Sequence, residues 1–309
     1  REVIRVTRHA RHGWLDTVMQ KRDLQSVYSW AQSIASSSTP KRPTKRAKKN
    51  EPPQQTETLP QVANNASEEQ EEDWIIPSDT EVALRMMQEQ FPKIDKVSVP
   101  PFVLLSQLYS TVKDRTFVDR ELEVMKQQRL VRVFKLSTGQ DDFAIMFFHD
   151  YIAQVNAAKS RLEGKHPQKD LIIFDWYINH ILPIHNDVGI TYMHLESLLY
   201  RVGQSLHENH ISLLIKAGFL VRQLAEDKSY WLAIPNIGFL LKNLTQGRKE
   251  LLSLLSRRQY KEMLMSLLEK KKLRMSQLGM QFHIRDLIGS GQLCLSRTPA
   301  GWLVHIPRG

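Results

Sequence analysis

Basic side chains are concentrated between residues 239 and 274, where ten Lys and Arg residues stand against three acidic residues. Ammonium and guanidinium groups gathered in this way suit phosphate, because each donates charge-assisted hydrogen bonds to the phosphate oxygens. On a helix with about 100° between residues, Lys242, Lys249 and Arg257 fall within a sector of about 80°. We therefore interpret this segment as a phosphate-binding surface.

Nine residues of the segment form the predicted DNA-binding set, which would hold phosphates without reading base sequence. They are Lys242, Lys249, Arg257, Arg258, Lys261, Lys270, Lys271, Lys272 and Arg274. About seven or eight phosphate contacts would make affinity fall steeply with salt, with a log–log slope of about −0.9 per contact. The alternative is an ordinary solvated helix face, and a helix break at Gly247 would turn Lys242 away from Lys249.

The elements that must position these residues begin with a helical connector over 236–272. Its leucines lie on the side opposite the lysines and are expected to face the core. They are Leu240, Leu244, Leu251, Leu254 and Leu255. The end of the connector, 259–272, would also open the last domain.

Two segments of the last third of the chain share one pattern, GFLVRQLAEDKSYWLAIP at 218–235 and GQLCLSRTPAGWLVHIP at 291–307. Each has two apolar runs split by a turn-rich spacer, which predicts a β-hairpin. Each follows a helix-like stretch, and helix, helix and closing hairpin are the winged-helix plan. Their first glycines are 73 residues apart, which is about the length of one such domain.

The sequence predicts a mostly helical α+β fold, with three tandem winged-helix domains after a disordered N-terminal tail. The predicted divisions are a tail with a basic cluster at 1–80, winged helices at 81–164 and 165–236, and the connector with a third winged helix at 237–309. In the first domain we expect a helix opened by Pro100-Pro101, a helix capped by Asp114 or Thr116, and strands at 130–137 and 143–148.

The third helix of each predicted domain is a weak candidate for reading bases in a DNA groove. The first would expose Asp119, Arg120, Glu123, Lys126 and Gln127, whose charges nearly cancel. The second would expose His207, Glu208 and Asn209, and the third offers His283, Arg285 and Asp286. The connector is therefore the stronger candidate for contacting DNA.

Motifs for catalysis and for metal or cofactor binding are missing from the sequence. A protein kinase needs a Gly-rich phosphate loop, a catalytic HRD-type Asp and a metal-binding DFG, and the nearest string is Asp142-Phe143-Ala144. His207-Glu208-Asn209-His210 is one residue short of H-E-x-x-H and indicates a polar helix surface. The single cysteine, Cys294, excludes a disulfide framework and Cys-based zinc sites. We expect neither an enzyme nor a cofactor.

The formal net charge of +10 points to a polyanionic partner. The basic run PKRPTKRAKK at 40–49 is typical of nuclear import, or else of a solvated tail that touches nucleic acid. Residues 51–81 hold nine acidic and no basic residues. No apolar stretch approaches the length of a membrane span.

Several strings resemble one family closely. They are PPFVLLSQLYSTVKDRT at 100–116, KAGFLV at 216–221, YWLAIP at 230–235, QGRKELLSLL at 246–255 and FHIRDLIG at 282–289. From about Val82 to Pro307 the chain resembles the serine/threonine-protein kinase 19 family, also called winged-helix repair factors, and looks like a non-mammalian member.

The resemblance implies three winged-helix domains, a nuclear and chromosomal location, and double-stranded DNA binding in transcription-coupled nucleotide excision repair. It implies docking to the stalled RNA polymerase II assembly, with the Cockayne syndrome A protein, the UV-stimulated scaffold protein and TFIIH, and a possible homodimer on DNA. Family DNA contacts carried over fall on Lys242, Lys271 and Lys272. The chain departs from the family at Ser256 and Gln259, where relatives carry basic residues.

The sequence as a whole predicts a nuclear, non-catalytic protein that binds double-stranded DNA and bridges it to repair proteins. One alternative is a protein-interaction scaffold that does not touch DNA. The other is a true protein serine/threonine kinase, against which the missing motifs count.

Overall fold

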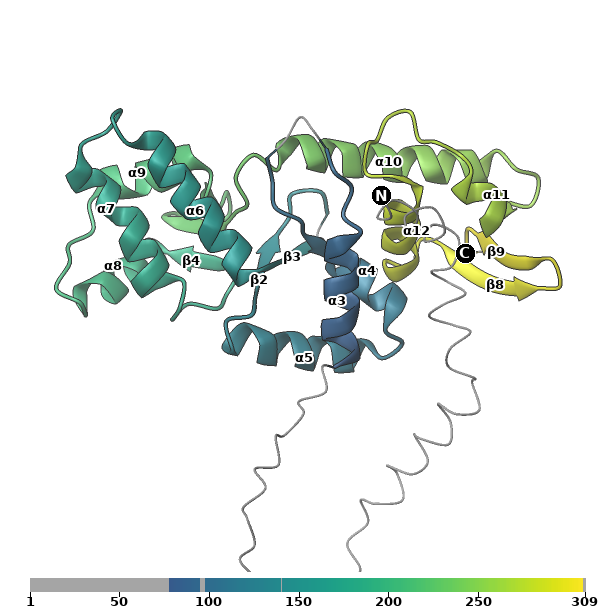
Figure 1. The fold of residues 1–309 in the computed structure, drawn as a ribbon, viewed down its shortest axis with the longest axis horizontal. Helices are drawn as coiled ribbons and strands as arrows, with labels where there is room; N and C mark the ends of the chain where they lie inside the picture. The colour runs from purple at the N-terminus through teal and green to yellow at the C-terminus, as the bar shows by residue number, and fades with distance from the viewer. Residues whose placement is uncertain (1–77, 95–97, 140, 308–309) are drawn as a thin grey trace, which may run out of the picture. The chain divides into compact units, whose positions relative to one another are not determined.

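The structure is a computed structural model that describes residues 78–94, 98–139 and 141–307. All of them belong to one compact unit, Glu72–Gly309. Among the described residues the fold is mostly helical α+β with three small antiparallel sheets of three strands each (Figure 1). The predicted tail lies almost wholly outside the described residues, including its basic cluster at 40–49. The first described helix already begins at Asp79, just before the predicted boundary.

The first sheet has the strand order β1-β3-β2. Its elements are α3 (Asp79–Glu89), β1 (Val103–Leu104), α4 (Leu105–Thr111), α5 (Arg115–Gln127), β2 (Val131–Lys135) and β3 (Phe143–Phe147). Asp114 caps α5 as predicted, because its carboxylate accepts hydrogen bonds from the backbone N–H groups of Thr116 and Phe117. The helix expected directly after Pro101 is wrong in its first turn. Val103 instead pairs with Ile145 of β3, and α4 begins at Leu105.

The second sheet repeats this order as β4-β6-β5. Helix α6 (Phe148–Leu162) contacts both the first sheet and α7 and leads to the second sheet. The elements that follow are α7 (Gln168–Trp176), the π-helical turn η1 (Tyr177–Ile181), β4 (Gly189–Thr191), α8 (Tyr192–Tyr200), α9 (Glu208–Ala217), β5 (Leu220–Arg222) and β6 (Ser229–Leu232). Helix α9 ends at Gly218, whose φ of +86° is left-handed. The glycine that opens the repeated hairpin pattern therefore ends the preceding helix.

The third sheet has the order β7-β9-β8. Its elements are α10 (Gly238–Ser256), β7 (Glu262–Leu264), α11 (Met265–Glu269), α12 (Met280–Gly289), β8 (Cys294–Thr298) and β9 (Gly301–His305). Both predicted hairpins are confirmed by the pairing of β5 with β6 and of β8 with β9. The connector helix over 236–272 is wrong in its second half. Helix α10 ends at Ser256, and Met263 of β7 pairs with Val304 of β9.

Each sheet has one strand that the sequence did not predict, namely β1, β4 and β7. These strands are two or three residues long. A run of that length cannot display the alternation of four or more residues by which a strand is identified.

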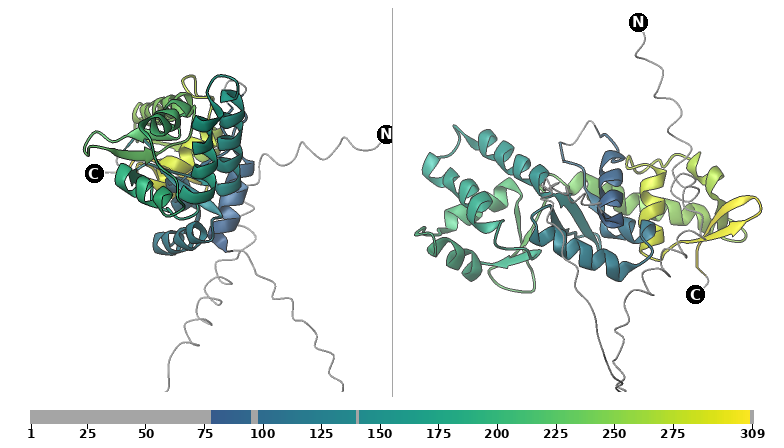
Figure 2. Two further views of the ribbon diagram at one scale, coloured as in Figure 1. Left: turned by 90° about the vertical axis from the view of Figure 1, so that its left-hand side faces the viewer. Right: turned by 60° about the horizontal axis from the view of Figure 1, so that its bottom comes forward.

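The three sheets and their helices pack on one another. One buried apolar cluster extends from Phe102 through Tyr177 to Phe282 and so includes residues around all three sheets. The guanidinium of Arg132, on β2, donates to the carbonyl oxygens of Leu182 and His185 after η1. Helix α12 lies between α10 and α4 (Figure 1, Figure 2). The packing around α12 fixes the orientation of α10, which carries the first of the predicted DNA-binding residues.

Candidate nucleic-acid interface

All nine predicted DNA-binding residues are exposed on the surface. None of the ion pairs found in the described part of the chain involves any of them. Their charges are therefore available to an anionic partner. We call these nine residues the basic ridge, and the structure places them on three successive segments rather than on one helix.

The first segment is α10 itself, which carries Lys242 and Lys249. The helix continues without a break through Gly247, so the two lysines stay two turns apart on the same side. The leucines on the opposite side face the core as predicted. Leu240, Leu244, Leu251 and Leu255 are at most 1% exposed, and Leu254 is half-buried.

The second segment is the turn after α10, with Arg257, Arg258 and Lys261. Arg257 is the C-cap of the helix, and Lys261 has a left-handed φ of +54°. The carbonyl oxygen of Lys261 accepts a hydrogen bond from the backbone N–H of Ile306, which ties the turn to the end of β9. The expectation that these residues continue the helix is wrong, although their exposure is as expected.

The third segment is the loop after α11, with Lys270, Lys271, Lys272 and Arg274. The carboxylate of Glu250 accepts hydrogen bonds from the backbone N–H groups of Arg274 and Met275 at 2.9–3.1 Å. The side-chain oxygen of Asn243 accepts another from the backbone N–H of Gln277 at 2.9 Å. Two residues of α10 thus hold the loop alongside the helix.

The three acidic residues of the 239–274 segment form no ion pair with the basic ridge. Of the three acids between 239 and 274, Glu250 binds backbone amides and Glu269 accepts from the side-chain amide of Gln281. Glu262 is half-buried on β7. The excess positive charge of this segment is therefore not cancelled by ion pairs within it.

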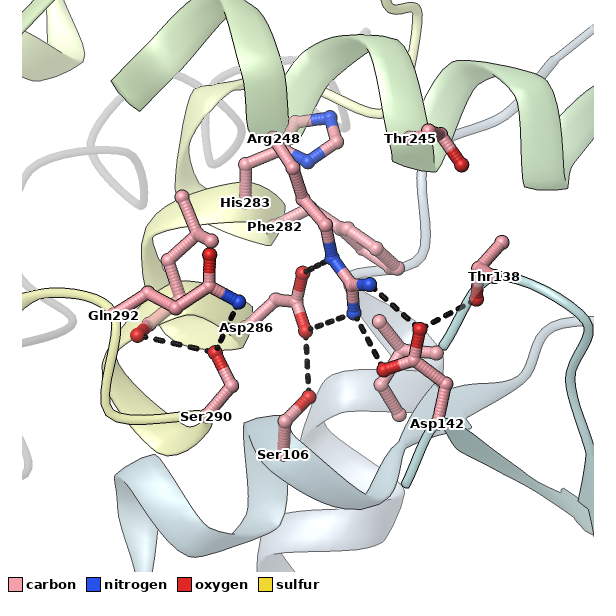
Figure 3. Close-up of polar contacts among 12 residues, drawn as sticks. Ser106, Thr138, Asp142, Thr245, Arg248, Phe282, His283, Asp286, Ser290 and Gln292 are labelled. Carbon is pink, nitrogen blue, oxygen red and sulfur yellow. Dashed lines mark hydrogen bonds and ion pairs between the residues drawn. The ribbon is translucent and has the colours of Figure 1, made fainter. Parts of the chain in front are cut away.

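Arg248 is the tenth basic residue of the segment; its side chain is only 13% exposed and points toward two carboxylates (Figure 3). Its guanidinium contacts the carboxylate of Asp142, before β3, at 2.6 and 3.0 Å. It also contacts the carboxylate of Asp286, on α12, at 2.6 and 2.8 Å. The hydroxyl groups of Ser106 and Thr138 donate to these two carboxylates. We call these five residues the Arg248 cluster.

The contacts within the Arg248 cluster favour the charged forms of Arg248 and Asp142. Burial alone would lower the pKa of Arg248, but the hydrogen bonds and charges of Asp286 and Asp142 raise it above its usual value. Burial would raise the pKa of Asp142, whereas the hydrogen bonds from Arg248 and Thr138 lower it. Arg248 and Asp142 are therefore charged at neutral pH, and the cluster joins α10 to the first sheet and to α12.

The sequence contained a signal for this role of Arg248. It lies four residues after Leu244, three before Leu251 and seven before Leu255, which is the spacing of one helix face. A cation on an apolar face needs a buried anionic partner. Those partners, Asp142 and Asp286, could not be identified without the fold.

Helix α12, which corresponds to the predicted third helix of the third domain, cannot present its polar side chains to DNA bases. His283 and Asp286 are 0% exposed and Arg285 is 9% exposed, so the expectation that α12 offers them is wrong. The side-chain amide of Gln107 donates to the backbone carbonyl of Phe282 at 3.1 Å, which holds α12 against α4. On α5, by contrast, Asp119, Arg120 and Glu123 are exposed as predicted.

The remaining motif candidates have structural roles. The carboxylate of Asp142, in the DFG-like string, is occupied by Arg248 and Thr138. His210 is buried and accepts a hydrogen bond from the backbone N–H of His207, so that string is only partly a polar surface. No group of metal-ligating residues was found within the described ranges. None of the described helices is long and apolar enough to cross a membrane.

Comparison with known proteins gives a consistent picture. The sequence model of the family described as inactive serine-threonine protein kinase 19 matches residues 76–306. Three similar proteins are each named winged helix repair factor 1. The protein from Dictyostelium discoideum is 30% identical over 78% of this chain and 69% of its own length. The Homo sapiens protein is 29% identical over 75% and 87%, and the Xenopus laevis protein 32% over 70% and 79%.

Proposed function

Because the chain belongs to the inactive serine-threonine protein kinase 19 family, we propose that it is a nuclear, double-stranded DNA-binding protein of DNA repair. The description of the family as inactive confirms the prediction that the chain is not an active kinase. Its action would be to bind and position rather than to catalyse.

The proposed architecture is three winged-helix domains, with the divisions predicted from the sequence. In support, each sheet has the same strand order, in which the last strand of the hairpin lies between the other two. In each, two helices separate the short first strand from the hairpin. The relatives named winged helix repair factor 1 favour the same interpretation.

The observation that carries DNA binding is the basic ridge, in which nine exposed cations have no ion-pair partner among the described residues. Phosphates would bind along α10, the 257–261 turn and the 270–274 loop, with release of counterions. The buried α12 and the mixed charge of α5 argue against base reading by those helices. The ridge would therefore hold duplexes of any sequence.

The repair role is proposed from the names of the relatives, which are called repair factors. Within repair we propose the transcription-coupled pathway, with the stalled RNA polymerase II assembly, the Cockayne syndrome A protein, the UV-stimulated scaffold protein and TFIIH as partners. Helix α5 suits a protein partner, because Phe117 and Val124 are 42% and 50% exposed beside charged residues.

Charge reversal on the ridge tests DNA binding directly. Lys242→Glu, Arg257→Glu and Lys271→Glu together should weaken binding to every duplex sequence and reduce the log–log salt slope by about 2.7. Fluorescence anisotropy at several salt concentrations measures both. The matched control reverses the charges of Lys169 on α7, Arg201 at the C-cap of α8 and Lys216 on α9, which are all exposed, and it changes the net charge equally. An equal loss in both variants, or a loss confined to one sequence, would contradict the proposal. The stoichiometry of the same titrations tests the predicted pairing of two copies on DNA.

A second candidate function is a protein-interaction scaffold that does not bind DNA. The burial of α12 and the near-neutral outer face of α5 favour it. It predicts that the wild-type chain does not bind duplex DNA even at low salt, which the same titration would detect.

A further inference from the structure

The third sheet has one face in the core and one face open. Val304 is 0% exposed and Met263 is 7% exposed, and both lie on the core face. Their neighbours along the strands point to the opposite face, because side chains alternate. There Glu262 and Cys294 lie on either side of His305, and each pairs with it in the register.

A hollow of about 410 Å³ lies over this open face. Its volume falls within the range of about 300–1,000 Å³ that small-molecule sites occupy. It is lined by Tyr260, Glu262, Cys294, Ser296, Leu303, His305, Ile306 and Pro307. The hydroxyl of Ser296 lies 3.4 Å from Nδ1 of His305, so two hydrogen-bonding groups sit side by side on its floor.

The chemistry of the lining limits what the hollow can hold. The carboxylate of Glu262 repels phosphate and other anions, and it accepts hydrogen bonds from N–H groups. No metal-ligating group of three residues was found in the described part of the chain. A planar, uncharged group with N–H donors and ring acceptors fits these conditions, and the edge of a nucleobase is such a group.

The position of the hollow connects it to the basic ridge. Tyr260 lines the hollow, is 65% exposed and lies between Arg258 and Lys261 of the ridge. An exposed aromatic ring among cations is the arrangement by which proteins bind unpaired bases, with the ring stacking on the base and the cations holding the backbone. A strand whose phosphates lie on the 257–261 turn would pass the opening of the hollow.

We propose that this hollow binds one unpaired nucleobase, which stacks on Tyr260 and donates to Glu262, with Ser296 and His305 beside it. The inference rests on the proposed DNA binding and makes it more specific, because the chain would then prefer duplexes that end in a short single strand. A duplex without unpaired bases would use the ridge alone.

The test compares two DNAs and four proteins. A blunt duplex and the same duplex with a three-nucleotide adenine overhang are titrated by fluorescence anisotropy with wild type, Tyr260→Ala, Tyr260→Phe and the control Tyr200→Ala. Tyr200 is 81% exposed on α8, far along the chain from the ridge. We expect wild type, Tyr260→Phe and the control to bind the overhang DNA about tenfold more tightly than blunt DNA, which one stacked base can provide. In Tyr260→Ala this ratio should fall to about one.

A fluorescent adenine analogue in the overhang gives a second readout, because stacking on a tyrosine ring quenches it. Quenching by wild type and not by Tyr260→Ala is expected. Equal affinity of wild type for both DNAs, or an unchanged ratio in Tyr260→Ala, would overturn the base-binding site and leave duplex binding standing. Failure of wild type to bind either DNA would overturn the proposed function itself.

Discussion

Arg248 and Lys249 are consecutive residues of α10 with opposite surroundings. The side chain of Arg248 is 13% exposed and contacts two carboxylates. Lys249 is exposed and forms no ion pair with another described residue. Because one residue turns a helix by about 100°, the first lies on the leucine side and the second on the ridge. Equal charges on one helix thus support the fold at one position and, in the proposed function, would bind phosphate at the next.

The difference shows how the protein keeps a dense row of cations in place. The Arg248 cluster joins α10 to Asp142, before β3, and to Asp286 on α12. One guanidinium in it contacts two carboxyl groups, and neither of them belongs to α10. The helix that carries Lys242 and Lys249 is therefore fixed by buried contacts in which the ridge itself takes no part.

The largest expected effect follows from removing the buried cation. Arg248→Met leaves Asp142 and Asp286 facing each other with no cation between them, and breaking a buried pair costs about 3–5 kcal/mol of unfolding free energy. Urea unfolding measures the loss, with Lys249→Met as the matched control on the neighbouring residue. A loss below about 1 kcal/mol for Arg248→Met would contradict the difference drawn between the two positions.

The next largest expected effect is a pH dependence of the unfolding free energy, caused by a buried histidine of α12. Burial lowers the pKa of His283 on α12 to about 4, and its Nδ1 has no hydrogen-bond partner. The unfolded chain takes up this proton at about pH 6.5 and the folded chain only near pH 4, so stability is complete above pH 6.5 and falls as the pH drops between these values. The shift corresponds to about 3 kcal/mol at pH 4.

His283→Gln isolates this contribution, because the other buried histidines, His185 and His210, remain in both proteins. Urea unfolding between pH 4 and 7 should show a weaker fall of stability in the variant. Parallel curves for the two proteins would mean that His283 does not titrate between the two states.

Patterns within short stretches of the sequence predicted part of this structure. Helical periodicity identified the leucine side of α10, and the two apolar runs split by a turn-rich spacer within 291–307 identified a hairpin. The nine ridge residues are all exposed, and for Lys242 and Lys249 the position opposite the leucines implied this. These predictions depend only on residues near one another in the chain.

Such local patterns could not predict contacts between residues that lie far apart in the sequence. Arg248 is 106 residues from Asp142, and Ser106 is 180 residues from Asp286. Short strands such as β7 exist only because β9 offers them a partner. The end of α10 at Ser256 has the same origin, since the chain must turn to place Glu262–Leu264 beside β9.

A third, smaller effect tests the packing that keeps α10 continuous between Lys242 and Lys249. A Cβ added to Gly247 would lie 2.1 Å from Nε2 of His283, a side chain held by Ser276. Gly247→Ala should therefore lower the unfolding free energy by about 1–2 kcal/mol, since overpacking outweighs the better helix propensity of alanine. Gly238→Ala, on the same helix with nothing within 4 Å, should be neutral or slightly stabilising. Equal urea midpoints for the two variants would contradict this, because they would show that His283 moves away from the added methyl group at little cost in free energy.

The smallest effect is expected on the ridge. Lys249→Ala and Lys271→Ala should each change the unfolding free energy by no more than about 0.5 kcal/mol, because neither side chain has an ion pair to lose. The sign should be towards greater stability, since each substitution removes one of several neighbouring like charges. Urea unfolding at low and high salt distinguishes this origin, because about 1 M salt shortens the screening length to about 3 Å and should abolish the gain. A loss of stability on the scale of Arg248→Met would mean that these lysines support the fold, and the separation between a buried structural cation and an exposed binding surface would no longer hold.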